Sequence, residues 1–265
     1  MNIEPKIRFE NVDKVFQARR KTITALKDIS FDVMPGEFVS IVGPSGCGKS
    51  TIIRLIDEII KPSAGDIFID GYKYEKKVSK DVLRKIGFIF QSPNLLPWLT
   101  VKENMEFPLK ICGDKSKEGK DRVDEMLYKA RAYDFKDKYP SELSGGMAQR
   151  VGVYRAMVTD PEILLMDEPF GALDEVLRDS LNMELLDLWT ETKKTIVLIT
   201  HSISEAVMLS DRVLVMNTNP GRIVKDITID LPRPRKLEMA LDARFEELEK
   251  LITGIIGEID LNEIV

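Results

Sequence analysis

An eight-residue run near the start of the chain constrains the fold more strongly than any other stretch. Residues 43–50 read Gly-Pro-Ser-Gly-Cys-Gly-Lys-Ser and match G-x-x-x-x-G-K-[ST], the pattern of a loop that wraps phosphate groups. The β-branched apolar run at residues 38–42 predicts a buried strand before this loop. Apolar residues at helical spacing predict a helix after it, namely Ile52, Leu55, Ile56 and Ile59. The predicted order is therefore strand, glycine-rich loop and helix, which is the context that such a loop requires.

Each residue type in this loop has a physical reason to be there. Glycines let the backbone turn its N–H groups toward an anion, in a conformation that side chains obstruct. Lys49 places a point charge on the β- and γ-phosphates, and Ser50 offers a hydroxyl to Mg²⁺. The helix that begins here also directs its positive end at the phosphates. We therefore expect nucleotide contacts from Gly43, Pro44, Ser45, Gly46, Cys47, Gly48, Lys49 and Ser50.

Composition narrows the class of protein and its partners. With 265 residues, of which 43% are apolar and 31% charged, the chain resembles an ordinary globular protein of one or two domains. A net charge of −5 gives no basic excess, so we expect no nucleic-acid partner. Residues 1–5 lack the basic and apolar segments of a leader, and no apolar run is long enough to span a bilayer, which predicts at most peripheral membrane association. Two cysteines, Cys47 and Cys112, are too few for a disulfide framework and indicate a reducing compartment such as the cytosol.

Strand and helix patterns alternate along most of the chain. Strand patterns occur at residues 7–16, 29–33, 66–70, 86–90, 163–166, 195–199 and 212–216. Helical periodicity dominates residues 93–159 and predicts a helical insertion, and further helices are expected at residues 173–193 and 237–256. Strands that alternate with helices predict a parallel sheet that binds ligands at the carboxyl ends of its strands.

Two adjacent acids follow one of the apolar strand patterns. The run at residues 163–166 leads directly into Asp167 and Glu168. A buried strand has no use for charge at its end unless a cation is near, and the phosphate loop would bring Mg²⁺ there. This favours Asp167 as the carboxylate on the metal side and Glu168 as the base that deprotonates an attacking water. The alternative is that both acids are solvated charges at a strand end.

Three further sites carry polar residues that the fold alone does not require. Ser144 can cap a helix in which Gly145 and Gly146 leave the first N–H groups open, which makes a second anion site or an ordinary capped helix. His201, the one histidine, follows the strand at residues 195–199 and is expected near the γ-phosphate. Gln91 follows another strand, where an amide can contact both a metal and an attacking water. A satisfied surface histidine and a polar strand end are the alternative interpretations.

Taken together, these motifs resemble those of the nucleotide-binding subunit of an ATP-binding cassette (ABC) transporter, over about residues 6–235. Residues 43–50 match Walker A, Gln91 the Q-loop and His201 the switch histidine. The signature, Walker B and D-loop motifs fall in the family order at residues 143–147, 163–168 and 171–174. The resemblance implies an α/β fold with a P-loop NTPase (RecA-like) core and a parallel sheet, an antiparallel β subdomain and an inserted helical subdomain.

The resemblance also implies how the chain is divided and how it binds ATP. We expect the nucleotide-binding core at residues 1–92 and 159–228, the helical subdomain at 93–158 and a C-terminal helical extension at 229–265. In the homodimer of this family, ATP lies between the P-loop of one copy and Ser144, Gly145 and Gly146 of the other. The expected Mg²⁺ ligands are Ser50, Gln91 and Asp167. Contacts with the nucleotide site are further implied for Thr51 at the α-phosphate, Phe16 stacked on adenine and Asp174 in the D-loop.

The sequence departs from the family pattern at four positions. Met147 replaces the usual glutamine of the signature, and Ser202 replaces the aspartate that often follows the switch histidine. Neither change removes a phosphate donor, so ATP hydrolysis is still expected. Gly152 and Tyr154 interrupt a helix that is usually rich in alanine, and the sequence alone offers no account of them.

Residues 91–104, 169–174 and 219–235 look like those of importers for nitrate, sulfonates, taurine and pyrimidine precursors. That branch implies a membrane permease that contacts the region after Gln91, a solute-binding protein outside the membrane, and a peripheral location on the cytoplasmic face. The apolar residues Leu95, Leu96 and Trp98 suit a contact with the permease, unless they are buried against the chain's own helical subdomain. Two alternatives remain, namely a soluble ABC-type ATPase that acts in assembly and a regulatory module that works through its C-terminal helix.

Overall fold

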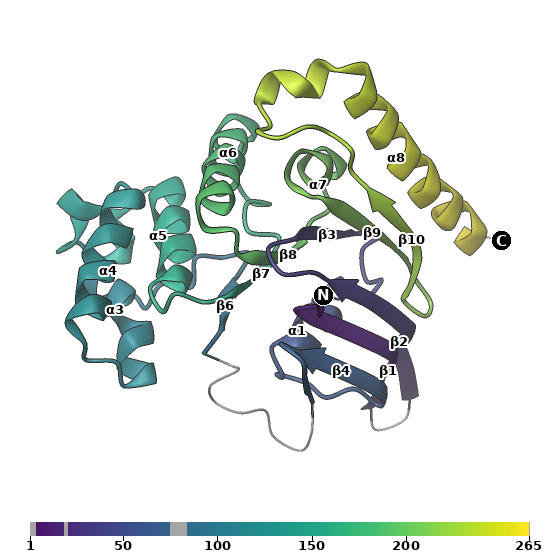
Figure 1. The fold of residues 1–265 in the computed structure, drawn as a ribbon, viewed down its shortest axis with the longest axis horizontal. Coiled ribbons are helices and arrows are strands. Elements are labelled where there is room, and N and C mark those ends of the chain that lie inside the picture. The colour runs from purple at the N-terminus through teal and green to yellow at the C-terminus, as the bar shows by residue number, and fades with distance from the viewer. Residues whose placement is uncertain (1–3, 19–20, 75–83, 265) are drawn as a thin grey trace.

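The computed structural model describes residues 4–18, 21–74 and 84–264, so residues 1–3 of the N-terminal segment lie outside the description. The described chain forms two sheets, a group of helices beside the larger sheet, and a long C-terminal helix (Figure 1). Among the described helices, none has the length and apolar content needed to cross a bilayer.

The larger sheet has six strands in the order β10-β9-β3-β8-β7-β6. All neighbouring strands from β9 to β6 run parallel, and β10 pairs antiparallel with β9. Every residue of β3 and β8 is buried, because helices cover both faces of this sheet. The bounds are β3 Phe38–Val42, β6 Ile86–Ile89, β7 Ile163–Asp167, β8 Thr195–Ile199, β9 Arg212–Asn217 and β10 Arg222–Thr228. The predicted parallel sheet is confirmed.

The smaller sheet is antiparallel, with the order β2-β1-β4-β5. Its strands are β1 Ile7–Ala18, β2 Lys21–Val33, β4 Ala64–Ile69 and β5 Tyr72–Lys73. The strand expected from residue 29 begins at Lys21, because the backbone pairs with β1 from the Ala18–Lys21 end onward. Apolar side chains of β1 and β2 form one core with those of α1 (Lys49–Ile56) and the larger sheet. The expected antiparallel subdomain is therefore present and packs directly on the P-loop helix.

The helix after the P-loop is shorter than expected. It ends at Ile56, with Asp57 as the C-cap, and Ile59 lies outside it with 59% of its surface exposed. The reason is local, since Glu58 adopts a left-handed conformation with a φ of 53° that no helix continues through. The expectation that Ile59 belongs to the apolar face of this helix is wrong.

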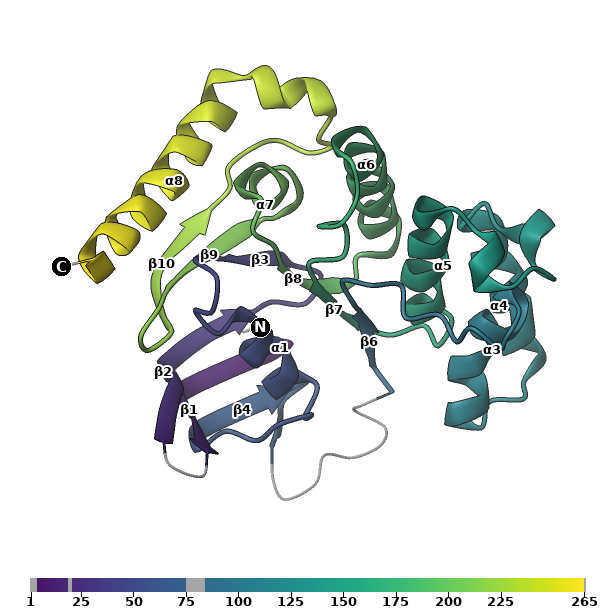
Figure 2. The same ribbon diagram turned by 180° about the vertical axis from the view of Figure 1, so that it is seen from behind.

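The helical insertion consists of α3 Val101–Cys112, α4 Lys117–Lys129 and α5 Gly145–Met157, with short 3-10 turns at Tyr133–Phe135 and Pro140–Glu142. Buried residues of the three helices, such as Met105, Leu127 and Val151, join one apolar cluster. Thr100 and Glu103 cap the first of these helices reciprocally, which fixes where it begins. Figure 2 shows this helical group beside the end of the larger sheet that carries β6.

Two helices of the second half flank the larger sheet, α6 Glu175–Thr192 and α7 Ile203–Leu209. The C-terminal helix α8 spans Ala243–Ile264 and buries Phe245, Leu248 and Ile252 in the same core as α7 and β9. A helix from residue 237 was expected, but residues Leu237–Leu241 form a 3-10 turn and Asp242 is extended, so the α-helix starts later. The division of the chain at residues 92, 158 and 228 stays a prediction.

Candidate functional site

Three parallel strands deliver the predicted site residues to one edge of the larger sheet. The P-loop follows β3, Glu168 follows β7, and His201 lies two residues beyond β8. Neighbouring parallel strands end side by side, so residues from distant parts of the sequence meet at their carboxyl ends.

The P-loop backbone needs glycine at several positions for two different reasons. Gly46 and Gly48 have φ angles of 81° and 102°, which side chains other than that of glycine rarely allow. A Cβ at Gly43 would lie 2.5 Å from the carbonyl oxygen of Met216, so lack of space excludes a side chain there in addition to the positive φ of 154°. The loop therefore has the shape that the sequence pattern predicts.

Lys49 lies inside the loop that it is expected to serve. Its Nζ donates to the carbonyl oxygens of Gly43 at 2.7 Å and Pro44 at 2.9 Å, and the residue is 7% exposed. Phosphate oxygens would compete with these carbonyls for the ammonium group. Burial raises the pKa of the Cys47 thiol, so this side chain stays neutral and contributes to the core beneath the loop.

Ser50 and Asp167 meet directly, since Ser50 Oγ donates to Asp167 Oδ1 at 3.2 Å. Burial raises the pKa of Asp167, the bond from Ser50 partly opposes this effect, and the charge of Glu168 adds to it. A buried carboxylate beside a hydroxyl fits a hard cation such as Mg²⁺. Within the described residues, no three His, Cys, Asp or Glu side chains form a closed metal cluster. An open site of this kind suits Mg²⁺, which takes one or two carboxylates together with substrate phosphates.

The Glu168 carboxylate lies between two other predicted site residues. Its Oε2 is 3.2 Å from Nδ1 of His201 and 3.5 Å from Nε2 of Gln91. The backbone of Glu168 is left-handed, with a φ of 47°, and its N–H donates to the carbonyl of Ile199. Such strain is found at functional sites, where the surrounding structure maintains it. Of the three predicted Mg²⁺ ligands, Ser50 and Asp167 contact each other, whereas Gln91 contacts Glu168.

The signature motif forms the tip of α5, away from the P-loop. Ser144 is the N-cap and accepts a hydrogen bond from the Met147 N–H at 3.3 Å. A Cβ built on Gly145 would meet no atom within 4 Å, so this side of the tip is open. Both ribbon views show α5 apart from α1, the helix that follows the P-loop (Figures 1 and 2). The helix tip that the sequence offers as a second anion site is therefore capped and open, and this chain does not bring it to its own P-loop. Anion binding there stays a prediction.

The remaining predicted contacts lie on the margins of the site. Phe16, on β1, is 39% exposed, with Lys14 Nζ 5.0 Å from its ring centroid. Asp174 caps α6 by accepting a hydrogen bond from Leu177 N–H at 3.0 Å. Thr51 lies in the first turn of α1, where its N–H donates to the carbonyl of Gly48. None of these three is in hydrogen-bond contact with Glu168 among the bonds of the described residues.

The structure also explains a helix position that the sequence left open. At Gly152, a Cβ would lie 3.1 Å from the carbonyl oxygen of Pro93, so α5 packs closely on the segment after Gln91. Arg155, one turn further along, donates to the carbonyls of Pro93 at 3.0 Å and Asn94 at 2.8 Å. The signature helix is thus fastened to the Q-loop segment.

Sequence reasoning missed two further residues that hold the loops of the site. Gln149 donates from its buried amide to the carbonyl of Pro169, directly after Glu168. Arg178 donates to the carbonyl of Leu173 at 2.6 Å and so holds the D-loop against α6. Gln149, Gly152 and Arg155 are each three residues apart, so they lie along one side of α5. A mixed polar and glycine stripe of this kind is a sequence signal for contacts between a helix and another segment.

A cavity of about 730 Å³ opens beside the Q-loop, between β6, α3 and α5. Its apolar lining includes Phe90, Leu96, Phe107 and Ile111. Of the run expected to contact a permease, only Leu96 lines this cavity, while Leu95 packs on the helical core and Trp98 is 68% exposed. The interpretation that this run is buried within the chain therefore holds for Leu95 alone.

Comparisons with known proteins agree with this geometry. A family model described as ABC transporter matches residues 26–171. The aliphatic sulfonates import ATP-binding protein SsuB of Bacillus cereus is 41% identical over 246 residues, which cover 93% of this chain and 94% of that protein. An uncharacterized ABC transporter ATP-binding protein of Methanocaldococcus jannaschii, MJ0412, is 41% identical over 253 residues, or 96% of this chain and 92% of that protein.

Solved structures give the same result for the fold. The dimeric post-hydrolysis state of the ATP-binding cassette MJ0796, bound to ADP and Pi, has a TM-score of 0.75 and 35% identity, covering 85% of this chain and all of that one. The structure of cbiO1 from Clostridium perfringens, part of the ABC transporter complex cbiONQ, has a TM-score of 0.75 and 26% identity, covering 96% of this chain and 98% of that one. With the P-loop, Glu168 and His201 at one sheet edge and the signature on a separate helix, the chain belongs to the ABC transporter family and is one of its ATP-binding, ATP-hydrolysing subunits.

Proposed function

We propose that two copies of this chain form the ATP-hydrolysing unit of an importer, with each ATP bound between the P-loop of one copy and the signature of the other. The observation that carries the proposal is the division of the site. Glu168 lies against His201 and Gln91 at the edge where the P-loop ends, whereas the tip of α5 is open and distant from that edge. A head-to-tail homodimer brings the two half-sites together.

In this proposal, the phosphates replace the carbonyl partners of Lys49 and are enclosed by the N–H groups of the loop. Residues 43–50 and Thr51 would bind the triphosphate, with Phe16 on the adenine. Ser50, Gln91 and Asp167 would hold Mg²⁺, whose positive charge favours the transition state at the terminal phosphate. Ser144, Gly145 and Gly146, with Asp174 nearby, would complete the site from the partner copy.

Glu168 is the proposed base, because its carboxylate is held by His201 and Gln91 and, among the residues that the structure describes, forms no ion pair with lysine or arginine. It would take the proton of the attacking water, and His201 would orient both the carboxylate and the γ-phosphate. Contacts of ATP with both copies exist only in the closed dimer, so ATP binding shifts the equilibrium toward closure and hydrolysis reverses it.

The importer assignment is supported by the relatives that are named as aliphatic sulfonate import proteins. We therefore propose that the cargo is a small solute of the sulfonate, taurine, nitrate or pyrimidine-precursor type. A solute-binding protein outside the membrane would deliver the solute to a permease in the membrane. This chain would lie peripherally on the cytoplasmic face. The permease would insert a short helix into the cavity between β6, α3 and α5, where apolar walls adjoin Gln91.

A Glu168→Gln variant tests the proposed site. It keeps the shape of the side chain and removes the base, so we expect ATP-dependent dimers by light scattering and a fall in hydrolysis of at least about a hundredfold. A monomer at high concentration with ATP, or unchanged turnover, would contradict the proposal. Lys49→Ala is the control, because it should weaken ATP binding and thereby raise the ATP concentration at which the dimer forms.

Charge placed in the cavity tests the permease contact. Ile111→Glu puts a carboxylate on the rim of an apolar cavity, where docking a helix would desolvate it. Leu241→Glu is the matched control, because Leu241 is 89% exposed in the turn before α8 and lines no part of that cavity. We expect co-purification with the permease to be lost for Ile111→Glu alone, and equal recovery of both variants would refute this docking site.

A further inference from the structure

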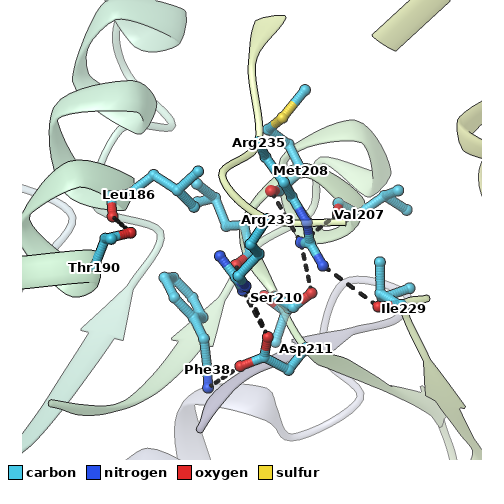
Figure 3. Close-up of polar contacts among 12 residues, drawn as sticks. Phe38, Leu186, Thr190, Val207, Met208, Ser210, Asp211, Ile229, Arg233 and Arg235 are labelled. Atoms are coloured by element: carbon cyan, nitrogen blue, oxygen red, sulfur yellow. Dashed lines mark hydrogen bonds and ion pairs between the residues drawn. The ribbon is translucent and has the colours of Figure 1, made fainter. Parts of the chain in front are cut away.

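The segment at residues 231–235 fastens the C-terminal extension to the body of the protein, and we call it the C-terminal strap. Its last residue, Arg235, is only 3% exposed, and Figure 3 shows its guanidinium inserted among backbone carbonyls. One terminal nitrogen donates to three carbonyl oxygens, those of Val207 at 3.0 Å, Met208 at 3.0 Å and Ser210 at 2.7 Å. These carbonyls lie at the C-terminal end of α7, where helices leave carbonyls without partners.

The second arginine of the strap binds two other elements. Arg233 stacks on the ring of Trp189 in α6, with 3.9 Å between its guanidinium carbon and the ring centroid. It also donates to Asp211 Oδ1 at 2.7 Å (Figure 3). The other oxygen of Asp211 accepts from the N–H of Phe38 at 2.9 Å, at the start of β3.

The strap therefore contacts α6 and α7 directly and is linked to the start of β3 through Asp211, in each case at the end opposite to the nucleotide site. The strand β3 leads into the P-loop, α6 begins after the D-loop residue Asp174, and α7 begins two residues after His201. The helix α7 has seven residues and so is about 10 Å long. Its residues Ala206, Val207 and Leu209 are fully buried, so the helix is packed as a rigid body.

A C-terminal helix can be held in place without a buried guanidinium, whose desolvation costs free energy. Burial, together with the charge of Arg233, lowers the pKa of Arg235 to about 10, so the side chain is still charged at neutral pH but loses much of its hydration. Well-packed apolar residues often replace buried charges without loss of stability. The guanidinium adds directional hydrogen bonds, because its planar donors fix the position of each carbonyl that it binds.

We propose that Arg235 is a positioning residue for His201, because it fixes the far end of the helix that begins two residues after this histidine. The C-terminal strap is then part of the hydrolytic machinery. This inference rests on the proposed role of His201 in hydrolysis.

His201 is the one histidine of the chain, so its ring gives a single NMR signal that reports its surroundings. Arg235→Met keeps the length of the stem and removes the donors. We expect it to shift the His201 Cε1–H resonance and to lower kcat about tenfold, while the Kd for ATP changes less than about twofold. Arg235→Lys restores donors at nearly the same place and should recover part of kcat. Arg244→Met is the matched control, because Arg244 lies in the same extension and pairs with exposed Asp230 and Glu247.

Two results would overturn the inference. One is an Arg235→Met protein with the wild-type resonance and kcat. The other is a loss of ATP affinity in proportion to kcat, which indicates a general structural role. If His201→Ala itself retains full turnover, the proposed role of His201 in hydrolysis is wrong. This result is separate from a failure of Arg235 to position His201, which the Arg235→Met protein reports.

A second variant decides the matter if Arg235→Met does not fold. Arg235→Gln keeps an amide donor but is too short to bind all the carbonyls that the guanidinium binds. We expect it to shift the His201 resonance and to lower kcat severalfold without a matching change in the Kd for ATP. A wild-type resonance together with a wild-type kcat would overturn the inference on its own.

Discussion

Gly152 shows how much a single residue depends on a segment far away in the sequence. Its helix position would tolerate alanine by torsion alone, and the usual preference for alanine in helices would favour the exchange. The structure opposes the exchange by proximity, because a Cβ at Gly152 would lie 3.1 Å from the carbonyl oxygen of Pro93. Gly254 in α8 is its natural comparison, since a Cβ there would meet no atom within 4 Å.

We predict opposite effects for alanine at these two glycines. Gly254→Ala should raise the free energy of unfolding by about 0.5–1 kcal/mol, through helix propensity. Gly152→Ala gains the same propensity but must displace Pro93, so its free energy of unfolding should fall below that of Gly254→Ala by roughly 1–3 kcal/mol. Urea denaturation of both variants measures the difference. An equal gain for both would show that α5 does not need its close approach to the Q-loop segment.

The residues of the site differ in how far the sequence could predict them. Lys49, Glu168 and His201 were predictable, because short motifs and strand ends carry their chemistry locally. The partners of Arg155 and Gln149 were not, since they are backbone carbonyls of segments up to 62 residues away. Every residue has a backbone carbonyl, so the sequence does not indicate which carbonyls an arginine will bind. Only the fold shows this.

Among the elements, the buried strands β3 and β8 and the largely buried β7 were predicted well, and helix ends were predicted poorly. Apolar periodicity defines the buried face of an element, but a single residue with positive φ or extended backbone ends it. Glu58 ends α1 before Ile59, and Asp242 delays the start of α8. Neither residue type signals these conformations in the sequence, which is why both boundaries were missed.

The C-terminal end of α1 carries a carboxylate that should make stability depend on pH. Burial raises the pKa of Asp57 to about 6, and its negative charge also opposes the helix dipole. The folded protein therefore binds this proton more tightly than the unfolded chain does, and ionisation of Asp57 lowers the free energy of unfolding as pH rises from about 4 to 6. Asp57→Asn should remove this loss and raise the free energy of unfolding at pH 7 by roughly 1–2 kcal/mol.

Denaturation by urea between pH 4 and 8 measures this effect, and Asp70 provides a control of opposite sign. Hydrogen bonds from Lys6 and Lys85 lower the pKa of Asp70, so its ionised form stabilises the fold and that contribution is lost as pH falls through its folded pKa. Asp70→Asn should therefore lower the free energy of unfolding at pH 7. A pH profile for Asp57→Asn that parallels the wild type would refute the assignment to Asp57.

At the scale of the whole molecule, the proposed function makes one chain the carrier of two complementary half-sites that it cannot join by itself. Ser50 and Asp167 are 3.2 Å apart, so the P-loop and the acids of Walker B belong to the same half-site. The tip of α5 lies elsewhere, with Gly145 open to solvent. Mixing two inactive variants can reveal whether the halves meet across a dimer, because defects in different half-sites complement each other only between chains.

We predict rescue when Lys49→Ala chains are mixed with Gly145→Asp chains. A Cβ at Gly145 has room, so we expect aspartate to leave the monomer intact. In the proposed dimer, its carboxylate would face the γ-phosphate bound by the partner. A mixed dimer then has one doubly defective site and one intact site. Random pairing makes half of the dimers mixed, so the mixture should reach about a quarter of wild-type hydrolysis if the two sites act independently.

The matched control mixes Lys49→Ala with Glu168→Gln. Both changes fall in the half-site that contains the P-loop, so each site of a mixed dimer retains one of the two defects and no hydrolysis is restored. The contrast between the two mixtures depends on geometry rather than on the severity of any one change. If both mixtures stay inactive although purification through two different affinity tags recovers mixed dimers, each nucleotide is completed within one chain, and the open tip of α5 needs another explanation.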